Sequence, residues 1–143
     1  MSLNLIVRRH VSVLFLVNSS IDEAALELTS FDARFFIANL RSRGVNGTAR
    51  VGTYMANGLA ELFGFFADNW KGWEGSKRWT SLEGELSIEA SSDRLGHVYL
   101  MVQLCEGAPA KWTLQANIVL EAGMLADLAA RAKGFERAVI AAA

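Results

Sequence analysis

Cysteine and histidine are nearly absent from this chain of 143 residues, which contains only Cys105, His10 and His97. A single cysteine cannot form an internal disulfide, and the three side chains together are too few for a structural zinc site. We therefore expect no disulfide, no metal and no other cofactor. A lack of disulfides is typical of a reducing compartment, so the sequence predicts a cytoplasmic protein.

Proline and net charge are also scarce. The chain has one proline, 52% hydrophobic residues and 20% charged residues, a composition that excludes a disordered or linker-rich protein. Its 14 basic and 15 acidic residues leave a net charge of −1. Nucleic-acid binders gain affinity by neutralising phosphates, so this balance argues against that class. The length predicts one domain over residues 1–143.

The N-terminal apolar run, residues 11–17, follows Arg8, Arg9 and His10, an order that resembles a secretory signal peptide. The run is far too short to span a membrane, and no small-x-small cleavage site follows it cleanly. We favour a buried strand over residues 5–17, because these residues are rich in β-branched and aliphatic side chains. A weak signal segment at residues 1–17 stays open as the alternative, and we expect no association with membranes.

Further strands are predicted over residues 22–29, 34–41 and 48–54, where apolar side chains recur between turn residues. The Asn46-Gly47 dipeptide predicts a turn between the last two strands. A helix follows, because apolar residues then recur at the spacing of one helical face. They are Met55, Leu59, Leu62, Phe63, Phe66 and Trp70.

Residues 82–119 carry the clearest pattern, three consecutive stretches in which apolar and polar residues alternate. Alternation with a period of two predicts an antiparallel meander with one apolar face. Keeping apolar residues opposite one another predicts that Ile88 pairs with Val98 and that Val102 pairs with Leu114.

A last helix is predicted over residues 121–133, and Gly134 either ends or kinks it or the tail to Ala143 continues as helix. The whole pattern predicts an α+β fold. Its antiparallel strands form one curved sheet or two packed sheets, with one central helix and one C-terminal helix.

Catalytic signatures are absent from the sequence. The chain has no G-x-S-x-G elbow, no Walker loop and no dinucleotide fingerprint. Cys105 and His97 share a predicted strand face but lie about 26 Å apart along it, too far to act together. The predicted register places Glu89 opposite His97, either as an acid–base pair or as a cross-strand pair that stabilises the sheet, and we favour the second. We therefore expect no enzymatic activity.

Tryptophans cluster at the end of the central helix, and arginines cluster before it. Trp70 and Trp79 are predicted to pack between the helix and the meander, whereas Trp73 is equally consistent with the core and with an interface. The arginine-rich stretch forms either a solvated hairpin face, which we favour, or a patch for an acidic partner. Its arginines are Arg34, Arg41, Arg43 and Arg50.

Three segments resemble a known bacterial family. They are Phe66-Ala67-Asp68-Asn69-Trp70-Lys71-Gly72-Trp73, Trp79-Thr80-Ser81-Leu82-Glu83-Gly84-Glu85-Leu86 and Gly96-His97-Val98. The family is described as domain of unknown function 6228, and the resemblance covers about residues 55–135. More loosely, the order of helix, meander and closing helix is similar to that of the WapI-like immunity proteins of polymorphic toxin systems. Those small cytoplasmic proteins bind and neutralise one cognate toxin, so this resemblance implies a protein partner, a secreted toxin domain.

We therefore expect a non-catalytic protein-binding module, most concretely an immunity protein that neutralises a toxin by binding it. Such a module needs exposed anchors, and the candidates lie at two predicted turns: Trp73, Glu74, Lys77, Arg78, Asp93 and Arg94. The alternative is a small-molecule binder or an enzyme that uses the polar face of the meander: Glu85, Glu89, His97, Tyr99, Gln103 and Gln115. Self-association, as in a homodimer, is a third hypothesis.

Overall fold

The computed structural model describes residues 14–53, 58–107 and 109–142. Within these residues the strands form two antiparallel sheets of four strands each, and two helices accompany them. The elements in chain order are β1 (Leu14–Asn18), β2 (Ala25–Ser30), β3 (Phe35–Ser42), β4 (Val45–Gly52), α2 (Gly58–Asp68), β5 (Lys77–Thr80), β6 (Leu86–Ser92), β7 (His97–Glu106), β8 (Trp112–Glu121) and α3 (Ala122–Ala142). The predicted α+β class is confirmed in its two-sheet form.

The first sheet has the strand order β1-β2-β3-β4, and each neighbouring pair is antiparallel. The strands predicted at residues 22–29, 34–41 and 48–54 correspond to β2, β3 and β4, with shifted ends. Residues 1–13 lie outside the described part of the chain. The choice between a signal segment and a strand over residues 5–13 therefore stays a prediction.

The turn between β3 and β4 lies earlier than predicted. Ser42 pairs with Val45, so the turn consists of Arg43 and Gly44, and Gly44 has the positive φ of +75° that a tight turn requires. The glycine of the predicted Asn46-Gly47 turn has a different reason. A Cβ atom at Gly47 would lie 3.0 Å from Leu114 in β8, so glycine there allows the two sheets to approach closely.

The second sheet has the order β5-β6-β7-β8 and contains the predicted meander, but its predicted register is wrong. Ile88 pairs with Val102, four residues beyond Val98, and Val102 pairs with Ala116, two residues beyond Leu114. Both displacements are even, so the apolar side chains keep the inner face. The sheet therefore buries the residues that the alternation predicted, although their partners differ.

The two helices pack their apolar faces on the sheets. In α2 the buried side chains include Leu59, Leu62, Phe63 and Phe66, all from the predicted helical stripe, whose first member Met55 lies outside the described residues. The helix α3 does not end at Gly134 but continues to Ala142, which confirms the prediction that the tail is helical.

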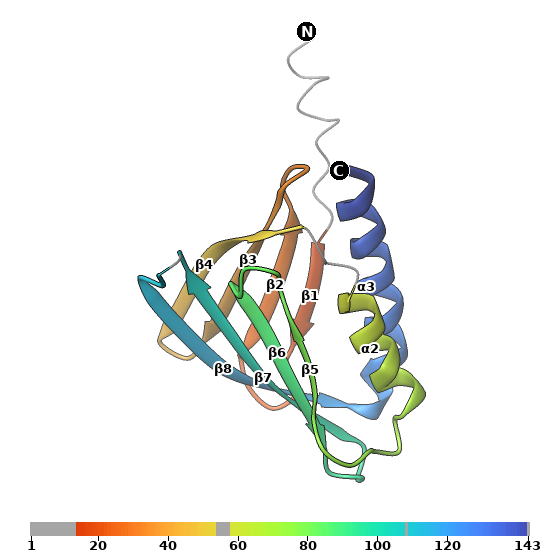
Figure 1. Cartoon of the computed structure of the whole chain (residues 1–143). Coiled ribbons are helices and arrows are strands. Elements are labelled where there is room, and N and C mark those ends of the chain that lie inside the picture. Colours follow the sequence, from red (N-terminus) through yellow and green to blue (C-terminus); the bar gives the residue numbers. More distant parts are fainter. Residues whose placement is uncertain (1–13, 54–57, 108, 143) are drawn as a thin grey trace, which may run out of the picture.

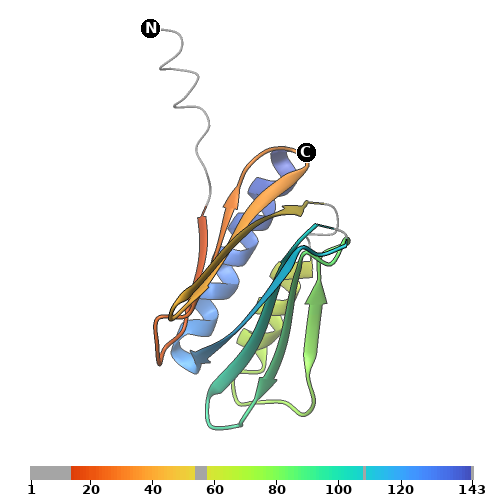
Figure 2. The same cartoon turned by 90° about the vertical axis from the view of Figure 1, so that its left-hand side faces the viewer.

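Figure 1 shows the two helices side by side along one flank of the sheets, and Figure 2 shows α3 behind the first sheet and α2 behind the second. Phenylalanine rings from both helices and the first sheet join them in the core. Phe15 of β1 meets Phe63 edge to face at 5.2 Å, and Phe36 of β3 meets Phe135 of α3 in the same way at 5.4 Å. No helix of the described residues is long and apolar enough to cross a membrane.

Candidate functional site

Two loops meet at the lower end of the molecule in Figure 1: the connection from α2 to β5 and the turn from β6 to β7. Gly72 in the first loop has a φ of +113°, and a Cβ atom there would lie only 2.8 Å from the Cα atom of Arg94 in the second. An ion pair reinforces this contact, because Nη2 of Arg94 lies 2.6 Å from Oε1 of Glu74. We call residues 69–76 and 93–96 the tip surface.

Asp93 organises the β6–β7 turn. Its carboxylate accepts hydrogen bonds from the backbone N–H groups of Leu95 (2.8 Å) and His97 (3.1 Å), from the Tyr99 hydroxyl (2.8 Å) and from Nδ1 of His97 (2.7 Å). Desolvation by itself would raise the pKa of Asp93, but these hydrogen bonds outweigh it and hold the pKa well below its usual range. The bond to Asp93 also raises the pKa of Tyr99. The turn is therefore held by a fixed carboxylate.

Arg94, the next residue, has a strained backbone. Its φ of 66° lies in the left-handed region, and it is the one non-glycine residue of the described chain with a positive φ. This conformation costs a residue with a Cβ atom about 1–2 kcal/mol. Strain of this kind persists only where the surroundings impose it, here the Asp93 turn and the contact with Gly72, and it is common at functional sites.

Two large apolar side chains are exposed on the tip surface. Leu95 is 81% exposed and Trp70 is 52% exposed, with Nζ of Lys71 5.3 Å from the centre of the Trp70 ring. The predicted burial of Trp70 is wrong, because α2 ends at Asp68 and Trp70 lies in the loop beyond it. Trp79, which lies in β5 and is 8% exposed, is buried as predicted.

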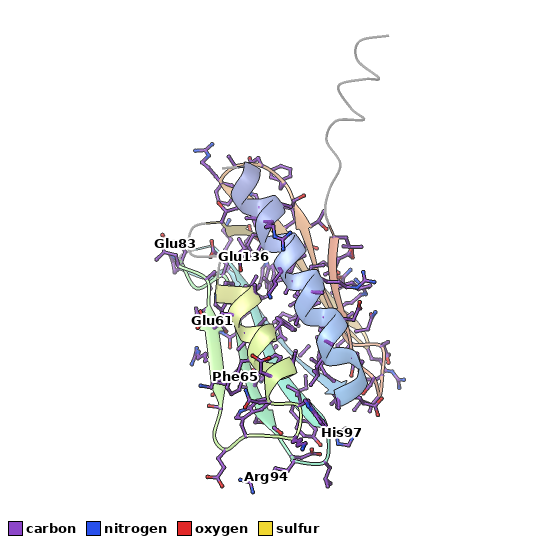
Figure 3. All side chains as sticks on the ribbon, turned by 90° about the vertical axis from the view of Figure 1, so that its right-hand side faces the viewer. Glu61, Phe65, Glu83, Arg94, His97 and Glu136 are labelled. Carbon is purple, nitrogen blue, oxygen red and sulfur yellow. The ribbon has the colours of Figure 1, made fainter. Side chains whose placement is uncertain are left out.

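The six predicted partner-binding residues are only partly brought together. Glu74, Asp93 and Arg94 lie on the tip surface, although the Asp93 carboxylate is occupied by its own turn. Trp73 turns inward and stacks on Phe66, with ring centres 5.6 Å apart. Figure 3 shows Arg94 and His97 together at this end of the molecule.

The other two residues of that prediction lie elsewhere. Lys77 extends over the ring of Phe65 on α2, at 4.5 Å from its centre, and Arg78 stands opposite Glu89 in the second sheet. The prediction missed Trp70 and Leu95, although an apolar residue in a loop between polar neighbours is a usable signal.

The polar face of the second sheet gathers most of the alternative site. The strand register places Gln103 directly opposite Gln115, and Tyr99 follows on the same face of β7. Glu89 faces Met101 and not His97, so the predicted Glu89–His97 pair is wrong. The reason is the shorter turn, in which Asp93 takes His97 as its partner.

Glu85 departs from that face. Its carboxylate accepts hydrogen bonds from the Ser81 hydroxyl at 2.8 Å and from the backbone N–H of Gly52 in β4 at 3.3 Å. The remaining face contains a hollow of about 430 Å³. Tyr99 and Met101, which line it, are 43% and 40% exposed.

The arginine-rich stretch is partly neutralised by glutamates of the same sheet region. Arg41 pairs with Glu27 at 3.5 Å and Arg43 pairs with Glu23 at 2.9 Å, while the guanidinium of Arg50 lies over the ring of Phe35. These contacts favour a solvated sheet face over a patch for an acidic partner. Across the described residues, no three histidine, cysteine, aspartate or glutamate side chains are grouped so that they could hold a metal ion.

The pattern of a family described as "Family of unknown function (DUF6228)" matches residues 18–138. The chain belongs to the DUF6228 family. The match extends well before residue 55, where the resemblance described above begins, and it includes both sheets and most of both helices of this DUF6228 protein. A comparison with curated proteins found no match.

The Trp-x-Gly-Trp segment of this DUF6228 protein has three different structural roles. Trp70 is exposed, Gly72 makes room for Arg94, and Trp73 stacks on Phe66. The segment therefore anchors the tip surface to the core through Trp73 and presents one large aromatic side chain to solvent.

Proposed function

We propose that this DUF6228 protein is a non-catalytic binding protein that contacts a protein partner through the tip surface. The observation that carries the proposal is the exposure of Trp70 and Leu95 on two loops that are fixed to one another at Gly72, Glu74 and Arg94. In its most concrete form the partner is a toxin, and the protein neutralises it, as the WapI-like immunity proteins that the chain loosely resembles do.

The composition and rigidity of the tip surface support this proposal. Tryptophan and arginine are the residues most enriched among those that dominate binding energy at interfaces. An exposed tryptophan beside an exposed leucine also forms an apolar centre with a charged rim, here Glu74 and Arg94. Because the two loops already contact each other, a partner does not have to order them, which reduces the entropic cost of binding.

Affinity capture with the whole chain tests the proposal. Trp70→Ala/Leu95→Ala removes both apolar anchors, and Ile21→Ala/Leu82→Ala removes two similarly exposed apolar side chains outside the tip surface. We expect one protein to be captured from a native lysate by the wild type and by the control variant, and to be lost from the tip variant. Co-expression then tests neutralisation: the captured protein should arrest growth alone, and the wild type should restore it.

The proposal fails if the tip variant captures the same protein as well as the control variant does. Capture without any growth effect of the captured protein would retain the binding function and exclude the toxin. An unfolded tip variant is recognised by circular dichroism, and single substitutions at Trp70 and Leu95 then replace the double one.

One observation favours the alternative of small-molecule binding or catalysis, namely the hollow beside Tyr99 and Met101 on the second sheet. A Met101→Arg variant fills this hollow and leaves the tip surface intact. Loss of function in that variant, with normal function of Trp70→Ala/Leu95→Ala, would favour the sheet face as the site.

A further inference from the structure

The strand β4 forms an edge of the first sheet and has backbone groups without a partner. In an antiparallel ladder, alternate residues direct their N–H and C=O groups toward the neighbouring strand and the residues between them direct theirs away. Gly52 directs its N–H away from β3, because it donates to Glu85 of the second sheet. The same alternation directs the backbone groups of Thr48 and Arg50 outward, and no residue of the described chain pairs with them.

Glu85 shows what this edge accepts. Its carboxylate oxygen lies 3.3 Å from the Gly52 nitrogen, in the position that a carbonyl group of an added strand would take. A side chain of one sheet therefore closes one end of the edge of the other sheet. The edge next to it, from Arg50 toward the β3–β4 turn, stays open.

A groove of about 490 Å³ lies beside the open part of the edge. Phe35 and Ile37 of β3 supply apolar surface, and Thr48 and Arg50 come from β4 itself. The other wall comes from the second sheet and carries only carboxylates as charged groups. These are Glu83, Glu85 and Glu106.

The carboxylates of this wall are incompletely neutralised. Glu106 accepts a hydrogen bond from Nε1 of Trp112 at 3.1 Å, and Glu85 accepts those from Ser81 and Gly52. None of the ion pairs formed among the described residues includes Glu83, Glu85 or Glu106. The groove thus combines unpaired strand backbone on one side with negative charge on the other.

We propose that this groove binds an extended, lysine- or arginine-rich segment of a protein partner, which pairs with β4 as an additional strand. Main-chain hydrogen bonds to Thr48 and Arg50 supply affinity, and basic side chains of the segment contact the glutamates of the opposite wall. Figure 3 shows Glu83 at the opposite end of the molecule from Arg94, so the groove is separate from the tip surface. The inference does not depend on the proposed function.

Fluorescence anisotropy with short labelled peptides tests the inference on the full-length chain. The probes are a capped peptide of alternating lysine and threonine, its counterpart with glutamate in place of lysine, and the lysine peptide N-methylated at alternate amides along one edge. We expect the lysine peptide to bind about tenfold more tightly than either of the others. N-methylation removes the strand-pairing donors and leaves the charge unchanged, so it separates backbone pairing from simple attraction.

Matched variants locate the site. Glu83→Gln/Glu106→Gln should weaken binding of the lysine peptide about tenfold, whereas Glu61→Gln/Glu121→Gln, with the same change in net charge, should leave it unchanged. Bound peptide should also slow hydrogen exchange of the Thr48 and Arg50 amides. Equal binding of the methylated and unmethylated peptides, equal loss in both glutamine variants, or no binding at millimolar concentration would each overturn the inference.

Discussion

Oδ2 of Asp93 lies 2.7 Å from Nδ1 of His97, and this contact closes the turn that sets the register of β6 on β7. The same carboxylate accepts the backbone N–H groups of Leu95 and His97, so one side chain determines where β6 ends and β7 begins. Its neighbour Arg94 then reaches Glu74 in the other loop. The tip surface depends in this way on a single aspartate.

Asp93→Ala should lower the stability of the protein more than a typical surface substitution, because it removes the acceptor of four hydrogen bonds. The midpoint of urea unfolding measures the effect. Asp127→Ala is the control, since Asp127 makes only an exposed ion pair with Arg131 within α3. Equal midpoints for the two variants would show that Asp93 does not hold the turn.

The lowered pKa of Asp93 also predicts a pH dependence. The unfolded chain takes up a proton at the ordinary aspartate pKa of about 3.9, whereas the folded chain does so only at lower pH. The stabilisation is therefore fully present above that value and is lost as the pH falls below it toward the folded pKa. Between pH 7 and pH 3, Asp93→Asn should lose less stability than the wild type, as urea midpoints at the two pH values would reveal.

Trp79 and Trp70 should differ sharply in their contribution to stability. Trp79 is buried, so Trp79→Ala should lower the free energy of unfolding by about 3–5 kcal/mol. Trp70 is half exposed and lies outside the core, so Trp70→Ala should have a small effect. Chemical denaturation of both variants measures the difference. Similar losses would contradict the assignment of Trp70 to the tip surface.

Gly64 and Gly58 of α2 should respond oppositely to alanine. Gly64 has open space where a Cβ atom would be, so Gly64→Ala should stabilise the helix by about 1 kcal/mol. A Cβ atom at Gly58 would overlap the indole ring of Trp79, which is buried and cannot move away freely. Gly58→Ala should therefore destabilise the protein, and thermal melting of the two variants provides the comparison. A gain in both would mean that Trp79 can shift.

Arg94→Gly and Arg94→Ala separate backbone strain from the ion pair. Both variants lose the contact with Glu74, but only glycine adopts the left-handed conformation without strain. We expect Arg94→Gly to be about 1 kcal/mol more stable than Arg94→Ala. Both should bind the partner of the tip surface less well than the wild type. If alanine is as stable as glycine, the backbone at this position is not strained.

The sequence by itself determined which side chains lie inside the sheets. Alternation with a period of two assigned Ile88, Val98 and Val102 to the inner face, and the structure confirms this although the register differs. The reason is that a displacement by an even number of residues preserves the face, so the pattern is insensitive to such an error. The register itself followed from Asp93, whose local hydrogen bonds made the turn shorter than the apolar pairing implied.

Only the tertiary structure decided where the candidate sites lie. Trp70 and Trp79 are the same residue type near the same helix, but the end of α2 at Asp68 leaves one in solvent and the other in the core. The contacts that define the tip surface and the β4 groove, Gly72 with Arg94 and Gly52 with Glu85, join residues 22 and 33 positions apart in the chain. Periodicity describes the neighbours of a residue along one element, and such contacts arise only when the elements pack.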